Sequence, residues 1–289
     1  MQIISGQQIA ESIYQKVTKQ LTASVRKFKL VIILATSETA ALTYTRLKQK
    51  AAANFGIDLQ IMQFADGVSA SELIENIKKL NQDPSVGGIM VQLPLYSYLK
   101  AQRWLIVNAI TPGKDVDGLT SSTLGKLAYD PNAKLKPATV VAILEILNQQ
   151  IPLKTLEGKH IVVANHSNLI GKPLSQFLLH YDATVSVTNV FTPQSVMHDL
   201  LKQADVTITA TGKARLWNPL LFKKGAGLID VTSVQTPEGV MGDYDRLKEK
   251  ELIAAKQELP LAWRTSVPGG VGPVTIACLL QNFVELVQG

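Results

Sequence analysis

Two kinds of hydrophobic pattern alternate along the chain and predict an α/β fold. Apolar residues recur every four positions from Ile9 to Leu21, which is typical of an amphipathic helix. A short, continuous apolar run follows at residues 30–35, as in a strand that is buried on both faces of a sheet. A further strand is expected around residues 59–64, and residues 86–93 are typical of another buried strand. Because helical segments separate these runs, the first half of the chain is predicted to build a parallel sheet.

Local signals predict where the helices of the first half begin and end. Gly56 is suited to end the helix that follows the first strand, and Ser69 with Glu72 forms a capping-box pattern at the start of the next one. From Ile110 to Lys136 the periodicity lapses into a loop-rich stretch with closely spaced glycines and charges, which we expect to be functional. A helix over residues 139–149 is then expected to cross to a second unit.

The alternation restarts in the second half and predicts a Rossmann-like, doubly wound parallel sheet. The expected strands lie near residues 160–164, 184–187, 206–210 and 227–231, with helices that begin near Gly171 and Gln194. A loop rich in glycine and proline, residues 265–275, precedes a terminal helix over residues 276–287. We expect this last helix to return to the first domain.

Composition and charge narrow the class of protein. Of the 289 residues, 46% are hydrophobic and 18% charged, which is typical of a folded globular protein. The net charge of +6 is spread along the chain, so it favours small anionic ligands over a nucleic-acid partner. The single cysteine, Cys278, excludes a disulfide framework and fits a reducing compartment. Neither a signal peptide nor a membrane-spanning run is recognised, so a cytoplasmic location is expected.

Tyr44 and Lys48 are the first candidates for chemistry. Four residues apart on a helix, they emerge one turn apart on the same face. Partial burial would lower the pKa of the ammonium, making it a usable acid or base near neutral pH. The alternative is a solvated helix face, since Arg46 and Lys50 lie nearby.

Two further candidates follow predicted strands or lie in the long loop. Gln92 is at the carboxyl end of a strand, where its amide offers a donor and an acceptor to a heterocycle, unless it is simply a polar strand end. Asp115, Asp117 and Gly118 suggest a metal loop at first sight, but the other oxygen ligands and the distal Glu of a calcium loop are missing. Asp117 is better interpreted as an acceptor for an amino-pyrimidine edge.

Two glycine-containing stretches complete the candidates. Residues 164–173 lack the dinucleotide-binding fingerprint GxGxxG, yet Ser167 and the amides that run toward Gly171 are suited to a pyrophosphate at a helix N-terminus. Residues 267–273 place three glycines between two prolines, where the backbone can approach a flat ligand. An ordinary turn explains either stretch as well.

Taken together and in order, these stretches resemble the methylenetetrahydrofolate dehydrogenase/cyclohydrolase family. The matching pieces are YTRLKQKA, GIMVQLPL, PGKDVDG, SNLIGKP, ATGKA, IDV followed by GVMGDYD, and SVPGGVGPVTIACLL. The resemblance implies two α/β domains with a cleft between them and a homodimer joined through its nucleotide domains. Residues 1–138 with 270–289 would form the folate-binding catalytic domain, and residues 139–269 the Rossmann-like dinucleotide-binding domain.

The resemblance also implies an activity and a set of residues. The enzyme would oxidise 5,10-methylenetetrahydrofolate with NADP, with NAD as the alternative, and hydrolyse the methenyl product to 10-formyltetrahydrofolate. Lys48 would be the central catalytic residue, Tyr44 would orient the folate, Gln92 would support Lys48, and Asp117 would hold the pterin. The other residues implied at the folate are Val91, Leu93, Pro268, Gly269, Gly270, Val271 and Gly272, and those at the dinucleotide are Asn165, His166, Ser167, Val190 and Ser233. No metal site is implied.

The departures from the family pattern fall mostly on the cofactor side. Residues 165–167 read Asn-His-Ser where the family has Gly-Arg-Ser, and residues 232–233 read Thr-Ser in place of Gly-Ile. The family's Cys-His pair is replaced at residues 188–189 by Thr-Asn, and a common serine by Ala41. Two alternatives therefore stay open: a cyclohydrolase whose dehydrogenase activity has lapsed or shifted to NAD, and a folate-binding protein without turnover.

Overall fold

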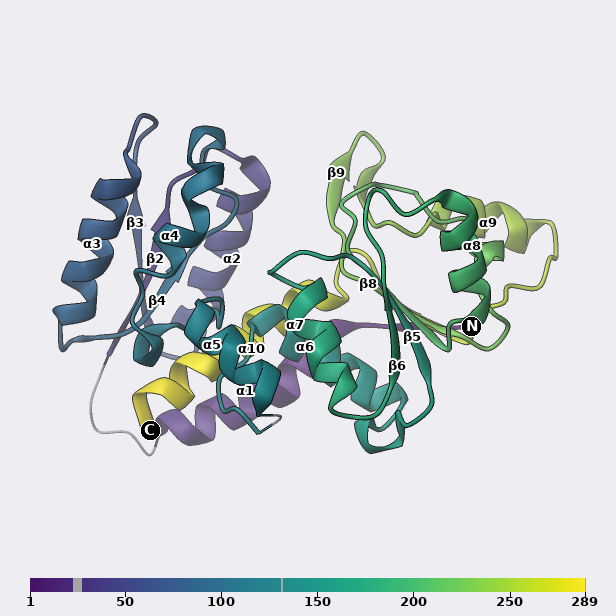
Figure 1. Cartoon of the computed structure of the whole chain (residues 1–289), viewed down its shortest axis with the longest axis horizontal. Helices are drawn as coiled ribbons and strands as arrows, with labels where there is room; N and C mark the ends of the chain where they lie inside the picture. The colour runs from purple at the N-terminus through teal and green to yellow at the C-terminus, as the bar shows by residue number, and fades with distance from the viewer. Residues whose placement is uncertain (23–27, 131, 289) are drawn as a thin grey trace. The chain divides into compact units, whose positions relative to one another are not determined.

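The computed structural model describes residues 1–22, 28–130 and 132–288, which form two compact units (Figure 1). One unit consists of residues 11–138 and 276–289, and the other of residues 1–10 and 139–275. We refer to them by their main sheets as the three-stranded and the six-stranded unit. The division differs from the expected one at the N-terminus, because the first strand pairs with the last strand of the six-stranded sheet.

The three-stranded unit is a parallel sheet in the order β3-β2-β4. Its strands are β2 (Lys29–Leu34), β3 (Asp58–Gln63) and β4 (Val86–Val91), and the helices between them are α2 (Thr39–Asn54) and α3 (Ala70–Gln82). The chain moves from β2 outward to β3 and then back across β2 to β4. Right-handed crossovers therefore place α2 and α3 on opposite faces (Figure 1).

The helix boundaries of this unit follow local signals. Ser69 caps α3, because its hydroxyl accepts a hydrogen bond from the Glu72 amide at 3.1 Å. Gly56 has a φ of +69°, the left-handed conformation that ends the α2 segment. The stretch after β4 also contains η1 (Ser97–Gln102) and α4 (Arg103–Val107).

We expected residues 110–136 to be a loop-rich stretch, but part of it is helical. It contains η2 (Pro112–Lys114) and the helix α5 (Ser121–Tyr129). Thr120 caps α5 through a hydrogen bond from the Thr123 amide, and Leu127 is buried beneath the helix. Because this helix is short and buries few residues, the sequence shows no clear hydrophobic period for it. The helix is recognised only from its tertiary packing.

Two long helices lie at the ends of the chain, α1 (Gly6–Thr22) and α10 (Val271–Gln288). The α10 helix begins five residues before the expected start at Ile276, because a proline at its third position is compatible with a first helical turn. Asn282 of α10 donates hydrogen bonds to the carbonyls of Val116 and Lys136, both at 2.9 Å. We expected no apolar run long enough to cross a membrane; α10 meets that length and hydropathy, but 61% of it is buried inside the chain, as in a core helix.

The six-stranded unit is an all-parallel sheet in the order β1-β11-β8-β7-β5-β6. Its strands are β1 (Gln2–Ile4), β5 (His160–Ala164), β6 (Thr184–Val187), β7 (Val206–Thr209), β8 (Gly227–Asp230) and β11 (Trp263–Thr265). Both neighbours of β5, β6 and β7, follow it in the chain, so the order reverses between β5 and β7. That reversal is the topological switch point of a doubly wound sheet.

Helices cover both faces of this sheet. The helices α6 (Ala138–Gln150) and α7 (Gly171–Leu179) lie on one face, and α8 (Gln194–Gln203) and α9 (Arg246–Ala254) on the other (Figure 1). Smaller elements are η3 (Leu153–Thr155), η4 (Pro219–Leu221) and the antiparallel ribbon of β9 (Val234–Thr236) and β10 (Gly239–Met241). The sequence pattern did not predict β1, β9, β10 or β11, all of which have only three residues.

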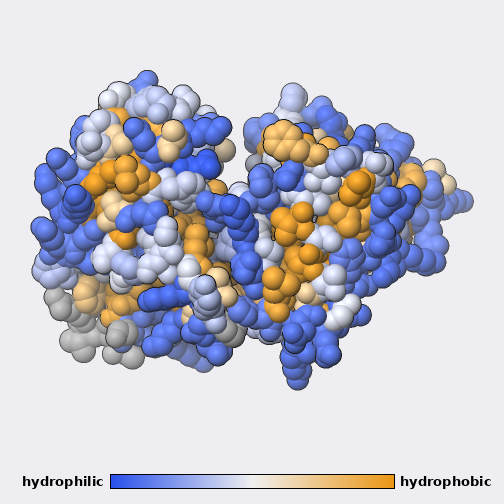
Figure 2. Space-filling view, in the orientation of Figure 1, coloured by the Kyte–Doolittle hydropathy of each residue, from blue (hydrophilic) through white to orange (hydrophobic). Residues whose placement is uncertain are grey.

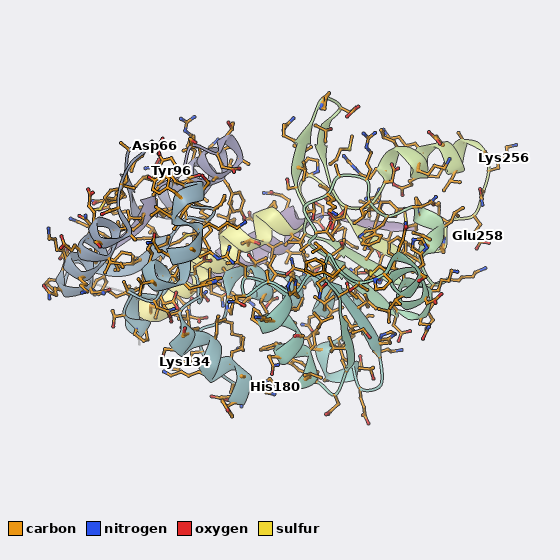
Figure 3. The ribbon with its side chains drawn as sticks, turned by 45° about the horizontal axis from the view of Figure 1, so that its top comes forward. Asp66, Tyr96, Lys134, His180, Lys256 and Glu258 are labelled. Carbon is orange, nitrogen blue, oxygen red and sulfur yellow. The ribbon has the colours of Figure 1, made fainter. Side chains whose placement is uncertain are left out.

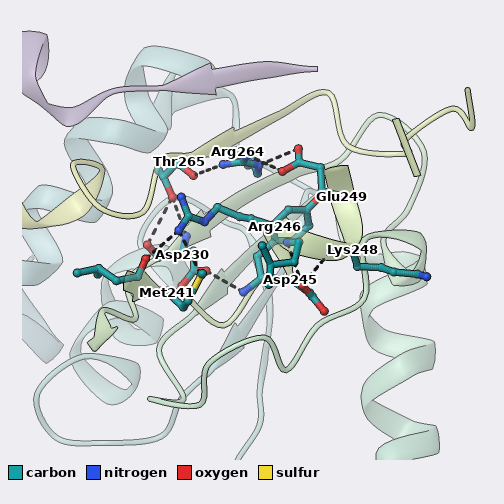
Figure 4. A network of polar contacts seen from close by, with 11 residues as sticks. Asp230, Met241, Asp245, Arg246, Lys248, Glu249, Arg264 and Thr265 are labelled. Atoms are coloured by element: carbon teal, nitrogen blue, oxygen red, sulfur yellow. Dashed lines mark hydrogen bonds and ion pairs between the residues drawn. The ribbon is translucent and has the colours of Figure 1, made fainter. Parts of the chain in front are cut away.

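A buried ion pair joins α9 to β11 in the six-stranded unit (Figure 4). The Arg264 guanidinium contacts the Glu249 carboxylate at two points, Nη2 to Oε2 at 2.6 Å and Nε to Oε1 at 3.2 Å. Its Nη1 donates to the Thr265 carbonyl at 3.1 Å, and the guanidinium lies 5.2 Å from the centre of the Tyr244 ring. Every charged atom of the pair is thus matched inside the protein.

Candidate active site

The site begins with the buried stripe of α2. Ala41, Thr45, Lys48 and Ala52 follow the helical period and face the interior. Lys48 is only 3% exposed, whereas Arg46 and Lys50 are exposed. The interpretation of Lys48 as part of a solvated helix face is therefore wrong.

Strand β4 and the residue after it supply the partners of Lys48. Met90 and Gln92 are two residues apart, so both side chains project from the same face of the strand. The Lys48 Nζ donates to Gln92 Oε1 at 2.9 Å and contacts Met90 Sδ at 3.4 Å. The amine has one oxygen acceptor and one sulfur acceptor, which is weak compensation for a buried ammonium.

The Gln92 amide is itself held in place. Its Oε1 also accepts a hydrogen bond from the Thr45 hydroxyl at 3.3 Å, and its Nε2 donates to the Leu93 carbonyl at 2.7 Å. The Leu93–Pro94 peptide bond that follows is cis. Gln92 therefore presents its oxygen, and not its NH₂ group, to Lys48.

Tyr44 lies beside the amine on the same helix. The Lys48 Nζ is 4.9 Å from the centre of the Tyr44 ring, within range of a cation–π interaction, and Tyr44 is half-buried. The pair that the four-residue spacing predicted is thus brought together. The arrangement places an aromatic surface next to a buried amine.

Burial shifts the titration of Lys48 and Asp117 in opposite directions. Burial lowers the pKa of Lys48 to about 8, and the negative charge of Asp117 opposes this shift. Burial likewise raises the pKa of Asp117 to about 6, against the attraction of the Lys48 charge. A neutral amine and an ionised carboxylate therefore coexist above about pH 8.

Asp115 builds the loop on which Asp117 stands. Its Oδ1 accepts hydrogen bonds from the amides of Gly118 and Leu119, and its Oδ2 accepts from the Thr120 amide and the Thr123 hydroxyl, all within 3.2 Å. Both oxygens of Asp115 are thus used to shape the loop and the start of α5. In the residues that the structure describes, no group of three or more His, Cys, Asp or Glu side chains is arranged to hold a metal ion.

Tyrosines fix the neighbouring loop after β3. The Tyr96 hydroxyl donates to the Phe64 carbonyl at 3.2 Å, and the Gly67 amide donates to the Tyr98 hydroxyl at 2.8 Å. Figure 3 places Tyr96 and Asp66 close together at this end of the unit. The loop after β3 and the segment with Tyr96 and Tyr98 after β4 both follow the carboxyl ends of strands, as Gln92 does.

The stretch at 267–273 belongs to the six-stranded unit up to Thr275, although residues 270–289 were expected in the other domain. The Val267–Pro268 bond is cis, and Gly269 has a φ of +92°. The Gly6 amide donates to the Gly269 carbonyl at 2.8 Å, so the two backbones approach closely. Val271 and Gly272 lie in the first turn of α10 rather than in a loop.

The expected dinucleotide residues lie at one edge of the six-stranded sheet. Residues 165–167 follow β5, Val190 follows β6 and Ser233 follows β8, and the carboxyl ends of parallel strands share an edge. His166 and Ser233 are exposed, and Val190 is 71% exposed beside Phe191 at 87%. Figure 2 shows hydrophobic patches, in orange, within a mostly hydrophilic surface.

The turn after β5 is closed by Asn165. Its Oδ1 accepts hydrogen bonds from the Ser167 amide, the Ser167 hydroxyl and the Gly171 amide at 2.7–3.0 Å. A Cβ on Gly171 would lie 1.9 Å from the Asn165 carbonyl oxygen, so only glycine allows the helix to start this close to the strand. Two of the amides expected to face a pyrophosphate thus already have a partner.

The sequence did not single out two contributors to the site, Thr45 and Met90. Thr45 lies three residues before Lys48 on the same helical stripe, and Met90 two residues before Gln92 on the same strand face. The spacing of Thr45 from Lys48 and of Met90 from Gln92 was visible in the sequence. A hydroxyl or a thioether among apolar residues does not by itself indicate a functional site, however.

Comparison with known proteins agrees with the geometry. Residues 4–117 match the family model described as "Tetrahydrofolate dehydrogenase/cyclohydrolase, catalytic domain", and residues 137–289 match its "NAD(P)-binding domain". The chain is 37% identical over 287 residues to the bifunctional protein FolD of a Hydrogenobaculum strain, covering 99% of this chain and 98% of that protein. It is 38% identical over 288 residues to FolD of Geobacillus kaustophilus, covering 98% and 96%.

Solved structures of FolD enzymes are also similar to this chain over nearly its whole length. FolD from Campylobacter jejuni superposes with a TM-score of 0.89 at 31% identity, over 100% of this chain and 99% of that one. The Trypanosoma brucei enzyme, crystallised with NADP cofactor and an inhibitor, superposes with a TM-score of 0.88 at 29% identity, over 99% and 97%. With both domains matched over nearly its whole length, the chain belongs to the tetrahydrofolate dehydrogenase/cyclohydrolase family.

Proposed function

We propose that this chain is a bifunctional enzyme that oxidises 5,10-methylenetetrahydrofolate with NADP and hydrolyses the methenyl product to 10-formyltetrahydrofolate. The observation that carries the proposal is the buried Lys48 amine, held 2.9 Å from the Gln92 oxygen. Burying a lysine with so few acceptors costs folding stability, and ionisable groups perturbed in this way cluster at functional sites. Membership of the family supports both activities.

Hydrolysis requires a base beside a cationic substrate, and Lys48 suits that task. When neutral, the amine has two N–H groups, which Gln92 and Met90 accept, and one lone pair left for a water proton. As Lys48 takes that proton, the water oxygen bonds to the methenyl carbon and forms a carbinolamine. The carbon–N5 bond then breaks as N5 receives the proton from Lys48. The carbinol hydroxyl loses its remaining proton to solvent, so that its oxygen becomes the formyl carbonyl of 10-formyltetrahydrofolate.

The neighbours of Lys48 position the folate in this proposal. The Tyr44 ring packs against the flat ligand, and Asp117, ionised near neutral pH, accepts hydrogen bonds from the amino-pyrimidine edge. The backbone of Val91 and Leu93, at the end of β4, lines the same ligand. None of these contacts requires a metal ion.

The carboxyl edge of the six-stranded sheet fits a dinucleotide in two respects. It contains the switch point between β5 and β7, and Gly171 lets a helix begin directly above the strand end. His166, Ser167, Val190 and Ser233 would hold the cofactor there, with His166 facing the 2′-phosphate, and Asn165 shapes the turn that carries them. A dinucleotide held there would supply the acceptor for the hydride of the methylene carbon.

The two half-reactions, assayed separately with purified protein and with each dinucleotide, test the proposal. We expect reduction of NADP by methylenetetrahydrofolate and hydrolysis of the methenyl form. If the protein only hydrolyses the methenyl form, it is a cyclohydrolase whose dehydrogenase activity has lapsed. If it oxidises methylenetetrahydrofolate faster with NAD than with NADP, its dehydrogenase activity has shifted to NAD. Folate binding with neither reaction would identify a non-catalytic protein and overturn the proposal.

The pH dependence of hydrolysis should follow the titration of Lys48. Because the neutral amine is the base, kcat/KM should rise through a midpoint near the Lys48 pKa of about 8. Asp117→Asn should move this midpoint to lower pH, since the Asp117 charge raises the Lys48 pKa. The exposed Asp66→Asn is the control and should leave the midpoint unchanged. Equal midpoints in all three proteins would contradict this role of the pair.

We also propose a cytoplasmic homodimer. In the described residues β6 is the outer strand of its sheet, and Val187 at its end is 43% exposed. An outer strand with exposed apolar side chains is suited to pair with a second copy. Sedimentation equilibrium should give twice the chain mass of 31.4 kDa, and Val187→Lys should shift the protein toward monomer. A monomer at all concentrations would exclude the dimer.

A further inference from the structure

Two side chains tie together the loops at the carboxyl edge of the six-stranded sheet. Asn165, after β5, donates from its Nδ2 to the carbonyl of Ala210, after β7, at 2.7 Å. Thr232, after β8, accepts a hydrogen bond on its Oγ1 from the Gly212 amide at 3.1 Å. The three neighbouring strands β5, β7 and β8 are thereby joined beyond their ends by side chains.

The Asn165 bridge crosses the switch point itself. The strands β5 and β7 are neighbours whose helical connections leave in opposite directions, and a ligand of a doubly wound sheet enters between them. The 2.7 Å bond from Asn165 to Ala210 spans this place.

The other end of the Asn165 amide imitates a bound anion. Its Oδ1 accepts from the Ser167 amide at 2.8 Å, the Ser167 hydroxyl at 2.7 Å and the Gly171 amide at 3.0 Å. Three donors that converge on one oxygen at the start of a helix are the usual environment of a phosphate oxygen. Here a side-chain oxygen of the protein already fills it.

We propose that Asn165 and Thr232 compete with the dinucleotide for the hydrogen-bond donors of this edge and so weaken the binding of NADP and NAD alike. This inference rests on the proposed function. The effect is shared by the two dinucleotides because the Asn165 oxygen occupies donors that suit a pyrophosphate, which both cofactors carry, and Thr232 occupies a further backbone amide at the same edge. The family pattern has glycine at both positions, and glycine has no side-chain oxygen that could compete for these donors.

The test measures dissociation constants of NADP and NAD for the full-length protein by isothermal titration calorimetry. Asn165→Ala should bind both dinucleotides about tenfold more tightly, because two amides and a hydroxyl are released to the ligand. Thr232→Ala should also bind both more tightly, whereas Thr232→Ser retains the hydroxyl and should match the unmutated chain. His166→Arg, by contrast, should strengthen the binding of NADP alone.

Asn148→Ala is the matched control. Asn148 Oδ1 also accepts a backbone amide, that of Leu153 at 3.0 Å, but it lies at the end of α6, before β5 begins. This variant should leave both dissociation constants unchanged. Thermal denaturation checks that every variant is folded, and Asn165→Gly, which restores the family residue and carries no competing oxygen, replaces Asn165→Ala if the latter is not.

The sign of the change separates competition from support. If Asn165 merely shapes the turn, its loss should weaken dinucleotide binding, and weaker or unchanged binding would overturn the inference. The hydrolysis of methenyltetrahydrofolate, which needs no dinucleotide, is assayed in parallel. A chain that hydrolyses and binds dinucleotide but does not respond to Asn165→Ala refutes this inference alone, whereas a chain without either reaction refutes the proposed function.

Discussion

Replacing Lys48 by methionine is expected to slow the hydrolysis of methenyltetrahydrofolate by about three orders of magnitude. Methionine fills a similar volume but cannot take a proton from water, and the contact with Gln92 Oε1 is lost. Because the ammonium is buried with few acceptors, the variant should be at least as stable as the unmutated chain. Steady-state hydrolysis rates and thermal denaturation measure the two effects.

Lys50→Met is the matched control on the same helix. Lys50 is exposed, two residues beyond Lys48, and its loss removes the same charge without touching Gln92. It should retain full activity. If Lys48→Met hydrolyses at an undiminished rate, another group must be the base. If the unmutated chain is inactive and folate binding is unaffected by the change, the chain is a binding protein.

The second large effect concerns stability. Arg264→Met should lower the free energy of unfolding by about 3–5 kcal/mol, because it leaves the Glu249 carboxylate buried without a partner. Replacing both residues by methionine should restore much of that loss, since the uncompensated charge is then gone. Urea denaturation of the two single variants and the double variant completes the thermodynamic cycle.

An exposed ion pair in the same unit provides the control. Lys224 and Glu258 are 3.1 Å apart, with side chains that are 81% and 79% exposed. Lys224→Met should leave the urea midpoint unchanged, because solvent screens this pair and its geometry is loosely held. Equal effects of Arg264→Met and Lys224→Met would show that burial of the Arg264 pair contributes nothing.

Local patterns were sufficient for much of the fold. The apolar runs at β2 and β4 are typical of buried strands, and the spacing of Ser69 and Glu72 located the start of α3. These features depend on residues within one turn or one strand, so the sequence carries them directly. The same holds for the shared face of Tyr44 and Lys48.

Elements that depend on distant partners were not predictable in this way. The three residues of β1 form a strand because they pair with β11, more than 250 positions later. The helix α5 depends on burial of Leu127 and on the Asp115 carboxylate, which also accepts the Thr123 hydroxyl. The start of α10 was misplaced because a proline can either break a helix or occupy its first turn.

For the site, the sequence by itself determined that Tyr44 and Lys48 share a helix face, that Gln92 ends a strand, and that the residues at 165–167 and 232–233 depart from the family pattern. Only the tertiary structure decided which face of α2 is buried, because helical periodicity groups residues without saying which group meets the core. Packing of α2 against the sheet puts Lys48 beside Met90 and Gln92, removes it from water, and so lowers its pKa. Likewise, only the strand order places Asn165 beside Ala210, because hydrogen bonds across a switch point join segments that the chain itself keeps 45 residues apart.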